Sequence, residues 1–357
     1  MKNIPIIIPA LDPDERFPVL LKALQEADLA PVIIVDDGSQ EKNQHYFEEA
    51  EKEYNCIILR HHVNMGKGRA LKDAFNYCLN QYPDIIGCVT ADSDGQHSPE
   101  CIRKCMEAMV AHPDELILGC RNFDLPDVPD KSRLGNKITR KVCKIMCGVS
   151  VTDTQTGLRA IPRSFMKHLL TVEGDRFEFE TNMLIETKDR VDIQEVEIQT
   201  IYDSKENHQS HFNPIKDSIR IYKLFGKIFV RFMLSSASSC VIDILMFAFF
   251  CNMLRSAYQQ IYVIWATFFS RVISATCNYL INYKLVFHST AKKHTSLGRY
   301  FILAVVQMTI SAVAVFALVS ILPKGTTEML VKIPVDVVLF FFSFVIQREF
   351  VYRNQKK

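Results

Sequence analysis

This 357-residue sequence lacks the signatures of several common protein classes. Its 11 cysteines form no Cys-x-x-Cys pair, so a zinc site is not expected, and we interpret them as small buried residues of a reducing compartment. Glycine (13) and proline (14) are too scarce for collagen or a low-complexity array, and 48% hydrophobic residues exclude a disordered chain. The first residues lack the apolar length of a signal peptide, so the N-terminal domain is expected to stay where it is made.

Acidic residues are scarce in the second part of the chain. Residues 228–357 hold 4 of the 40 Asp and Glu residues and 13 of the 42 Lys and Arg residues, which gives this part a net charge of +9. Residues 1–227 carry a net charge of −7 and few long apolar runs. This contrast predicts an acidic soluble domain over 1–227 and a basic membrane domain over 228–357.

Four apolar segments in the second domain approach the ~20 residues that a helix needs to cross a bilayer. Too few residues remain to build a soluble shell around four such runs, so we predict an all-α domain of four transmembrane helices. Basic residues flank the spans unevenly, and the positive-inside rule then predicts a multi-pass protein of the cell membrane with both termini and the first domain cytoplasmic. The predicted spans are 232–254, 261–283, 300–322 and 333–352.

Polar residues inside these spans leave two interpretations open. Such side chains are costly in lipid and are expected to face the interior of the bundle. There they form either a polar path that contacts lipid phosphate or hydrogen bonds between helices that hold the bundle together. The residues are Asp243, Arg271, Asn278, Asn282, Gln307 and Gln347.

Short apolar runs alternate with helical patterns in the first domain. This alternation predicts an α/β fold with a doubly wound, mainly parallel sheet, in which ligands bind beyond the carboxyl ends of the strands. The segments 9–12, 36–37 and 92–96, together with Arg121, fall at such strand ends. The predicted strands are 4–9, 31–35, 56–59, 84–89 and 116–119.

Asp92-Ser93-Asp94 follows the fourth predicted strand. Two carboxylates spaced by two residues point to the same side of an extended segment, and Gln96 adds an oxygen. An all-oxygen cluster suits Mg²⁺ or Mn²⁺, which would neutralise a leaving diphosphate. Asp-x-Asp alone is a weak signal, because solvated loop carboxylates are commoner. Its position after a buried strand, with a second acidic strand end nearby, strengthens it.

Asp36 and Asp37 lie too far along the predicted sheet to be assumed metal ligands. We expect them to accept hydrogen bonds from a nucleobase or from ribose hydroxyls. The stretch 64–69 lacks the spacing of a phosphate-binding P-loop, and we interpret it as a helix start near the nucleotide. No Gly-x-Gly-x-x-Gly opens the first helix, which argues against a dinucleotide-dependent oxidoreductase.

Several segments, taken in order, resemble glycosyltransferase family 2, and within it the polyprenyl-phosphate hexose synthases of the dolichyl-phosphate mannose synthase type. The likeness covers roughly residues 4–225. The remainder resembles a GtrA-like membrane domain, whose signature occurs at Asn278–Phe287 and, more loosely, at Phe344–Tyr352. The segments that carry the first likeness are Ile8-Pro9-Ala10, Val35-Asp36-Asp37-Gly38-Ser39, Asn64-x-Gly66-Lys67-Gly68, Ala91-Asp92-Ser93-Asp94-Gly95-Gln96-His97, Asp153-x-x-Thr156-Gly157-x-Arg159, Phe177-Glu178-Phe179-Glu180 and Ser210-His211-Phe212-Asn213-Pro214.

The resemblance implies a GT-A fold, a divalent metal, a nucleotide-sugar donor and an inverting transfer to a lipid phosphate. It places Arg121 and Arg133 at the phosphate groups of donor and acceptor, and Asp153 where it orients the sugar or the acceptor. It assigns the nucleoside pocket to Pro9, Leu11, Asp12, Asp36 and Asp37, and the metal and donor diphosphate to Asp92, Ser93, Asp94 and Gln96. Departures such as Asp12-Pro13-Asp14-Glu15 leave GDP-mannose, UDP-glucose and UDP-N-acetylglucosamine open as donors.

The chemistry of the acceptor agrees with this assignment. A lipid monophosphate has a second pKa near 6 and is already nucleophilic at neutral pH, so Asp153 is not needed as a strong base. The expected partners are a nucleotide sugar, a polyprenyl or dolichyl phosphate and the bilayer, with no nucleic acid and with a homo-oligomer left open. The basic amphipathic stretch 137–145 is either a helix in the headgroup layer or an ordinary surface helix.

Two alternative functions are weighed against this one. A processive polysaccharide synthase would carry Gln-x-x-Arg-Trp, whereas the only tryptophan is Trp265, inside a predicted span. A lipid-sugar flippase or scaffold with a merely regulatory transferase domain is disfavoured by the intact acidic cluster. The enzyme interpretation is therefore preferred.

Overall fold

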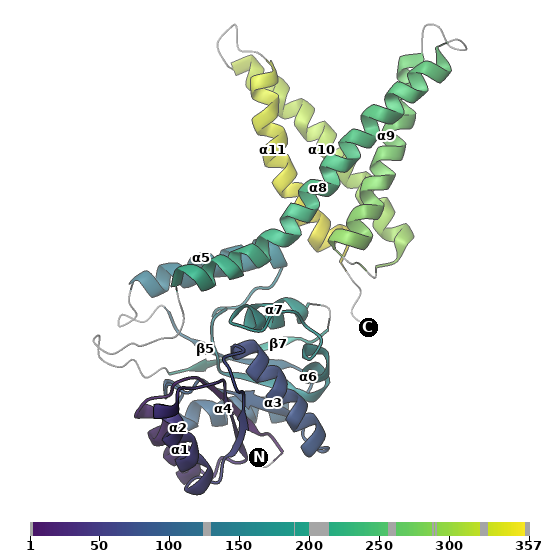
Figure 1. Ribbon diagram of the computed structural model, residues 1–357. Coiled ribbons are helices and arrows are strands. Elements are labelled where there is room, and N and C mark those ends of the chain that lie inside the picture. Colours follow the sequence, from purple (N-terminus) through teal and green to yellow (C-terminus); the bar gives the residue numbers. More distant parts are fainter. Residues whose placement is uncertain are drawn as a thin grey trace. The chain divides into compact units, whose positions relative to one another are not determined.

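The computed structural model describes residues 3–123, 130–188, 190–199, 214–255, 262–287, 289, 291–321 and 328–353, apart from some side chains within these ranges. The chain forms two compact units, Met1–Leu224 and Phe225–Lys357. The first contains a mixed α/β sheet, and the second is helical (Figure 1).

The sheet of the first unit consists of β1 Ile6–Ala10, β2 Val32–Asp36, β3 Ile57–Arg60, β4 Gly87–Thr90, β5 Leu116–Arg121, β6 Arg159–Pro162 and β7 Ile193–Ile198. Their order is β3-β2-β1-β4-β6-β5-β7. Strands β1 to β4 run parallel to one another, and β5 runs parallel to β7. The five predicted strands are confirmed, with ends that shift by up to three residues.

The sequence patterns miss β6 and β7. β6 runs antiparallel to both of its neighbours, β4 and β5, so the sheet is mixed, while its other paired strands run parallel, in agreement with the predicted mainly parallel sheet. β6 is short and begins with a charged residue, Arg159, which hides its burial from a hydropathy pattern. β7 lies at the edge of the sheet and contains three polar residues among its six, so it lacks the apolar run of a buried strand.

Helices cover both faces of the sheet (Figure 1). Ile6 and Ile8 of β1 pack in a core that includes Phe17 and Met106, while Ile7 between them is also fully buried. Ser98 caps the start of helix α4, because its hydroxyl accepts a hydrogen bond from the Cys101 amide. The helices are α1 Arg16–Glu26, α2 Gln44–Lys52, α3 Lys67–Gln81, α4 Pro99–Ala111, α5 Asp130–Cys147, α6 Arg163–Leu169 and α7 Glu178–Glu186, with a 3₁₀ turn at Glu41–Asn43.

The helices of the second unit are α8 Pro214–Leu254, whose first residues belong to the first unit, α9 Tyr262–Ile281, α10 Lys293–Ile321 and α11 Glu328–Ile346. Two π-helical turns, Asn282–Val286 and Gln347–Val351, continue α9 and α11. Both turns fall inside the two segments that carry the GtrA-like signature. The tyrosines Tyr279, Tyr283, Tyr300 and Tyr352 pack together beside these turns.

Within the described residues, two helical segments are long and apolar enough to cross a bilayer, Ile228–Leu254 and Lys293–Leu318. Helices α9 and α11 lie outside these two segments. The predicted count of four spans therefore stays a prediction.

Exposed apolar side chains are concentrated in the second unit among the described residues, as in Leu245, Phe316 and Ile321. Asn282 and Gln347 are buried, as predicted for polar residues of a membrane bundle. The prediction is wrong for Arg271, whose side chain is 72% exposed and reaches Asp243 at 3.5 Å from the outer side of α9. Its long side chain lets the charge stay outside while the ion pair forms.

Candidate active site

Polar segments meet at one edge of the sheet, where the parallel strands β1 to β4 end. Ala10, Asp36 and Arg60 are register partners at the ends of β1, β2 and β3. Because β6 runs antiparallel, the segment 153–158 that precedes it returns to the edge where β4 and β5 end. The structure thus brings this segment between the end of β4 and the end of β5.

The Asp92 carboxylate is held in an ion pair. Lys67 Nζ, at the start of α3, lies 2.7 Å from Asp92 Oδ1 and 3.0 Å from Glu180 Oε2 of α7. Burial alone raises the pKa of Asp92, but the Lys67 ammonium and the His97 ring more than offset it and hold that pKa well below its ordinary value. Burial lowers the pKa of Lys67, yet the two carboxylates bring it above its ordinary value. Asp92 and Lys67 are therefore both charged at neutral pH.

Asp94 lies in the turn that follows β4. Its Oδ1 accepts a hydrogen bond from the Gln96 amide at 3.1 Å, and Ser93 is half-buried beside it. Burial and the nearby negative charge of Asp92 raise the pKa of Asp94. A cation beside Asp94 would offset the repulsion between its carboxylate and that of Asp92 and so lower the pKa of Asp94.

Gly157 packs directly against the Asp92 carboxylate. A Cβ atom at this position would overlap Asp92 Oδ2, so a side chain there would displace the acidic group. His97 approaches the same oxygen, with Nε2 at 3.5 Å, and its buried Nδ1 has no hydrogen-bond partner among the described residues. The turn before β6 therefore has no room for a side chain at position 157.

A buried guanidinium, that of Arg159, lies close to the acidic residues. Arg159 is 1% exposed and donates to the backbone oxygens of Thr156 at 2.9 Å and Glu180 at 2.6 Å. Burial lowers the pKa of Arg159, while the carboxylates of Glu180, Asp153 and Asp92 act in the opposite direction. Its charge therefore balances part of the negative charge of the site from within the core.

Asp153 and Arg121 form a two-point ion pair at the end of β5. Arg121 Nε lies 2.6 Å from Asp153 Oδ2, and a terminal guanidinium nitrogen lies 3.1 Å from Oδ1. Asp153 is fully buried, and its Oδ1 also accepts a hydrogen bond from the Gln155 amide. The Arg121 side chain is 22% exposed and stacks over Phe123, so part of this guanidinium faces outward. Asp153 thus fixes the direction of Arg121.

Arg133 lies on α5 and is tied to the segment that follows β5. Its Nε donates to the backbone oxygen of Phe123 at 3.0 Å. Arg121 and Arg133 therefore share Phe123 as a neighbour, the first through its ring and the second through its carbonyl. Residues 124–129 lie outside the described part of the chain, as does most of the segment Ser210–Pro214 that contributes to the family resemblance.

Asp36 and Asp37 hold neighbouring loops. Asp36 accepts hydrogen bonds from the Ser39 amide at 2.8 Å and from Gln44 Nε2 at 2.9 Å. The two oxygens of Asp37 accept from the amides of Met65 and Gly66. His61 Nδ1 lies 2.7 Å from Asp37 as well. All four oxygens thus have partners within the chain, and contact with a nucleoside stays a prediction.

Asp12 links the loop that follows β1 to the loop that follows β2. Its backbone φ is +47°, and its carboxylate accepts hydrogen bonds from the Gln40 amide and from Asn43 Nδ2. Pro9 and Leu11, on either side of the end of β1, are half-buried. The five residues assigned to the nucleoside pocket therefore come from two adjacent strand ends.

Asp92, Asp94 and Gln96 lie in one turn and offer the oxygen ligands that Mg²⁺ or Mn²⁺ prefers. The described residues contain no group of three His, Cys, Asp or Glu side chains that could hold a metal ion. Lys67 also engages one oxygen of Asp92. The set fits a divalent cation only if a bound diphosphate completes its shell.

Sequence reasoning misses the roles of Lys67, Glu180 and Arg159. The signals were present, because all three lie in segments that carry the family resemblance. Nothing in their spacing showed that α3, α7 and β6 would bring them to Asp92. Only the mixed sheet places these elements together.

Known protein families match both units. A model described as "Glycosyl transferase family 2" matches residues 6–170, and one described as "GtrA/DPMS, transmembrane domain" matches residues 231–352. An uncharacterized protein of Methanocaldococcus jannaschii is 31% identical over 202 residues, which cover 55% of this chain and 81% of that protein. These matches confirm the resemblance drawn from the sequence motifs.

Two further relatives have names that state an activity. The UDP-N-acetylglucosamine–dolichyl-phosphate N-acetylglucosaminyltransferase of Methanococcus voltae is 30% identical over 219 residues, 56% of this chain and 86% of that protein. The undecaprenyl-phosphate mannosyltransferase of Micrococcus luteus is 26% identical over 193 residues, 51% of this chain and 76% of that protein. Each alignment covers about half of this chain.

Proposed function

The chain belongs to glycosyltransferase family 2 and carries a GtrA/DPMS transmembrane domain; from this premise we propose that it transfers one hexose from a nucleotide sugar to a polyprenyl phosphate at the cytoplasmic face of the membrane. The products are a nucleoside diphosphate and a polyprenyl-phosphate sugar. One observation carries the proposal: the same chain joins an acidic site at the strand ends to a membrane domain. Relatives named for transfer to dolichyl and undecaprenyl phosphate support it.

The reaction needs positioning more than proton transfer. A phosphate oxygen of the acceptor attacks the anomeric carbon, and the bond from that carbon to the donor diphosphate breaks with its electron pair on the diphosphate. Attack on the face opposite the leaving group inverts the anomeric configuration. The acceptor is largely dianionic at neutral pH, since its second pKa is about 6, and no base is required. The site must hold the reactants in line and stabilise the leaving charge.

Asp94, with Asp92 and Gln96, would hold a Mg²⁺ or Mn²⁺ ion together with the donor diphosphate. When bound, the cation supplies positive charge against the leaving diphosphate. Lys67 keeps Asp92 ionised and fixed, and Gly157 leaves room for its carboxylate. Ser93 lies in the same turn and would contact the diphosphate.

Arg121 and Arg133 would bind the phosphate groups of donor and acceptor. Arg121 can do so because Asp153 holds it from the buried side and leaves part of the guanidinium exposed. We therefore assign Asp153 as a positioning residue. Pro9, Leu11 and the loops held by Asp12, Asp36 and Asp37 would form the nucleoside pocket.

The acceptor would reach the site from the membrane. Helix α5 exposes Ile138 and Ile145, each about half exposed, beside exposed Lys137, Lys141 and Lys144. Apolar side chains among basic ones suit a helix that lies in an anionic headgroup layer. We propose that α5 lies in this layer. We also propose that the two domains comprise residues 1–227 and 228–357, and that the second crosses the membrane four times with both termini in the cytoplasm.

A transfer assay tests the reaction. The full chain in nanodiscs with undecaprenyl phosphate and Mn²⁺ is incubated separately with labelled UDP-N-acetylglucosamine, UDP-glucose and GDP-mannose. We expect lipid-linked label from one donor, with the anomeric configuration inverted in the NMR spectrum. Absence of lipid-linked label with every donor, from protein shown to be folded, would falsify the proposal.

The metal site has its own test, which does not depend on turnover. Lys67→Met removes the ammonium from Asp92 and Glu180 and should tighten Mn²⁺ binding about tenfold in electron paramagnetic resonance titrations. Lys104→Met, which removes an exposed partner of Glu100 on α4, is the matched control. Equal Mn²⁺ affinity in both variants would show that Lys67 does not share these carboxylates with a cation.

A further inference from the structure

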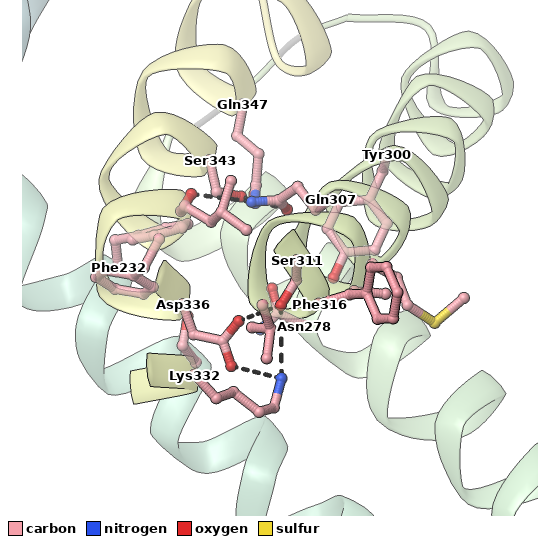
Figure 2. A pocket seen from close by; sticks show the side chains of 16 residues that line it. Phe232, Asn278, Tyr300, Gln307, Ser311, Phe316, Lys332, Asp336, Ser343 and Gln347 are labelled. Atoms are coloured by element: carbon pink, nitrogen blue, oxygen red, sulfur yellow. Dashed lines mark hydrogen bonds and ion pairs between the residues drawn. The ribbon is translucent and has the colours of Figure 1, made fainter. Parts of the chain in front are cut away.

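A cavity of about 750 Å³ lies inside the second unit, among helices α8, α9, α10 and α11. Its volume falls within the ~300–1,000 Å³ typical of sites for small molecules. Figure 2 shows its wall as a mixture of amides, hydroxyls, one ion pair and aromatic rings. The lining residues that carry the argument are Asn278, Gln307, Ser311, Lys332, Asp336, Ser343 and Gln347, with the rings of Phe232, Tyr300, Phe316 and Phe340.

One wall is a chain of hydrogen-bonded neutral groups. Gln347 Nε2 donates to Ser343 Oγ at 2.9 Å, and Ser343 Oγ donates to Gln307 Oε1 at 3.0 Å (Figure 2). Gln307 Nε2 donates to the Leu339 backbone oxygen. Each primary amide has two N–H groups, and these bonds use one of them on each glutamine. The lining therefore contains both donor and acceptor groups.

The same network contains a buried acceptor without a partner. Asn282 donates to Gln347 Oε1 at 3.1 Å, but its own Oδ1 has no hydrogen-bond partner among the described residues. Asn282 is fully buried. An unsatisfied polar atom is costly in a membrane protein, because lipid supplies no replacement. Bonding between the helices thus leaves one buried acceptor of the network, Asn282 Oδ1, unsatisfied.

The charges of the other wall cancel. Lys332 Nζ lies 2.8 Å from Asp336 Oδ2, and Ser311 donates to Asp336 Oδ1 at 2.6 Å (Figure 2). The only ammonium of the lining is therefore already paired with its only carboxylate. A wall with no net charge favours a neutral polar group over a bare phosphate, which would need an unpaired cation.

The edge of the cavity is apolar and open. Met308 and Phe316 line it and are 70% and 78% exposed, on a helix apolar enough to cross a bilayer. Polar residues of the lining such as Ser343 and Gln347 are buried instead. An occupant that enters past this edge needs an apolar tail and a polar head.

We propose that this cavity binds the neutral, hydroxyl-rich carbohydrate headgroup of a membrane lipid. Hydroxyls both donate and accept, as the amide wall does, and a sugar ring has apolar faces that fit the aromatic side chains. The identification of that lipid as the sugar-bearing product rests on the proposed function. A resident membrane glycolipid has the same chemistry, and the test separates the two sources.

The experiment localises the ligand within the full chain. The chain in nanodiscs is irradiated with farnesyl phosphate-glucose, -mannose or -N-acetylglucosamine that carries a diazirine in the farnesyl tail, and the crosslinks are mapped by peptide mass spectrometry. We expect label on α10 and α11 around the cavity. Diazirine-farnesyl phosphate without a sugar should label these helices at least about tenfold less.

Two pairs of variants separate occupancy from folding. Ala312→Trp fills the lining of the cavity and should abolish the label, whereas Ala317→Trp, an exposed alanine of the same helix outside the lining, should retain it. Ser343→Ala breaks the amide chain and should weaken the label, whereas Ser320→Ala removes a hydroxyl that only contacts its own helix. Label that is unaffected by Ala312→Trp, or equal for the sugar-free probe, would overturn the proposal.

The outcomes also separate this proposal from the proposed function. Lipid-linked transfer without label at the cavity overturns the cavity proposal alone. Sugar-dependent label without transfer supports the cavity and counts against the enzyme. Competition by glucosyl diacylglycerol as strong as that by the phosphate-linked sugar supports carbohydrate binding and assigns it to a resident glycolipid, while weaker competition assigns it to the product.

Discussion

The two units of this protein place polar groups in opposite ways. The first unit buries its apolar residues in a core and gathers ionised side chains at the edge of a sheet. There the Lys67 ammonium lies 2.7 Å from the Asp92 carboxylate and 3.0 Å from the Glu180 carboxylate. The second unit exposes many of its apolar residues and buries hydrogen-bonded amides such as Asn282 and Gln347.

This difference follows from the solvent that surrounds each unit, which is water for the first and lipid for the second. Water solvates charges at the rim of a site, so ionised groups can be collected there at moderate cost. Lipid solvates no polar atom, so a bundle satisfies its polar groups internally and favours neutral ones. The comparison predicts charge-dependent chemistry in the first unit and recognition by neutral hydrogen bonds in the second.

The largest effect is expected from removing a charge at the sheet edge. Asp94→Asn should lower transfer at least about a hundredfold, because it removes a ligand of the cation that stabilises the leaving diphosphate. Since the pKa of Asp94 is raised, its ionised form opposes folding, and the variant should unfold at an equal or higher temperature. Asp114→Asn, an exposed aspartate before β5, is the control. Undiminished turnover in Asp94→Asn would remove the cation from the mechanism.

A matched pair of substitutions tests the contrast between the two surfaces. Leu245 and Val110 are 63% and 57% exposed on helices of the second and first unit. Leu245→Asp should cost about 3 kcal/mol of membrane insertion, whereas Val110→Asp should leave stability within about 0.5 kcal/mol. Insertion efficiency and thermal unfolding measure the two effects. Similar small effects in both variants would mean that α8 does not face lipid.

Two glycines test the fit of the acidic site. Gly157→Ala places a methyl group on Asp92 Oδ2 and should destabilise the first unit by about 2 kcal/mol while lowering transfer. Gly135→Ala, in a helix with open space around the Cα, should be neutral or stabilising by about 0.5 kcal/mol. Urea unfolding of both variants compares them. Equal stability would show that the turn relaxes around a side chain.

The smallest effect requires no substitution. Burial raises the pKa of the Cys105 thiol to about 12. At pH 8 about one in 10,000 molecules would carry the thiolate, so N-ethylmaleimide should modify Cys105 only after unfolding. The thiol ionises at a lower pH in the unfolded chain than in the folded one. The free energy of unfolding should therefore fall as the pH rises from about 9 towards 12. Rapid modification of native protein at pH 8 would show that the core opens.

Local patterns were enough to predict much of the fold. The buried strands β1 to β5 depend on neighbouring residues, so hydropathy patterns located them. β6 depends on a partner far away in the chain, and its leading Arg159 resembles a surface residue until its bonds to Thr156 and Glu180 are known. Long-range pairing therefore limits such predictions.

The candidate site shows the same limit. Position after a strand end predicted Asp92, Asp94 and Arg121, because strand direction alone puts them at one edge. Two ion pairs, Lys67 with Asp92 and Arg121 with Asp153, depend on the directions of side chains, which the spacing of residues in the sequence does not determine. The cavity of the second unit was foreseen only as a set of interior polar residues, with Arg271 wrongly among them.

The paired π-helical turns of the second unit have a consequence for sequence length. Each turn accommodates one residue more than an α-helical turn, and their first residues, Asn282 and Gln347, bond to each other. Deleting one residue from either turn would rotate all that follows by about 100° and carry Val351 or Val286 out of its buried position. We therefore expect the loss of one residue from either turn to disrupt the packing of the second unit.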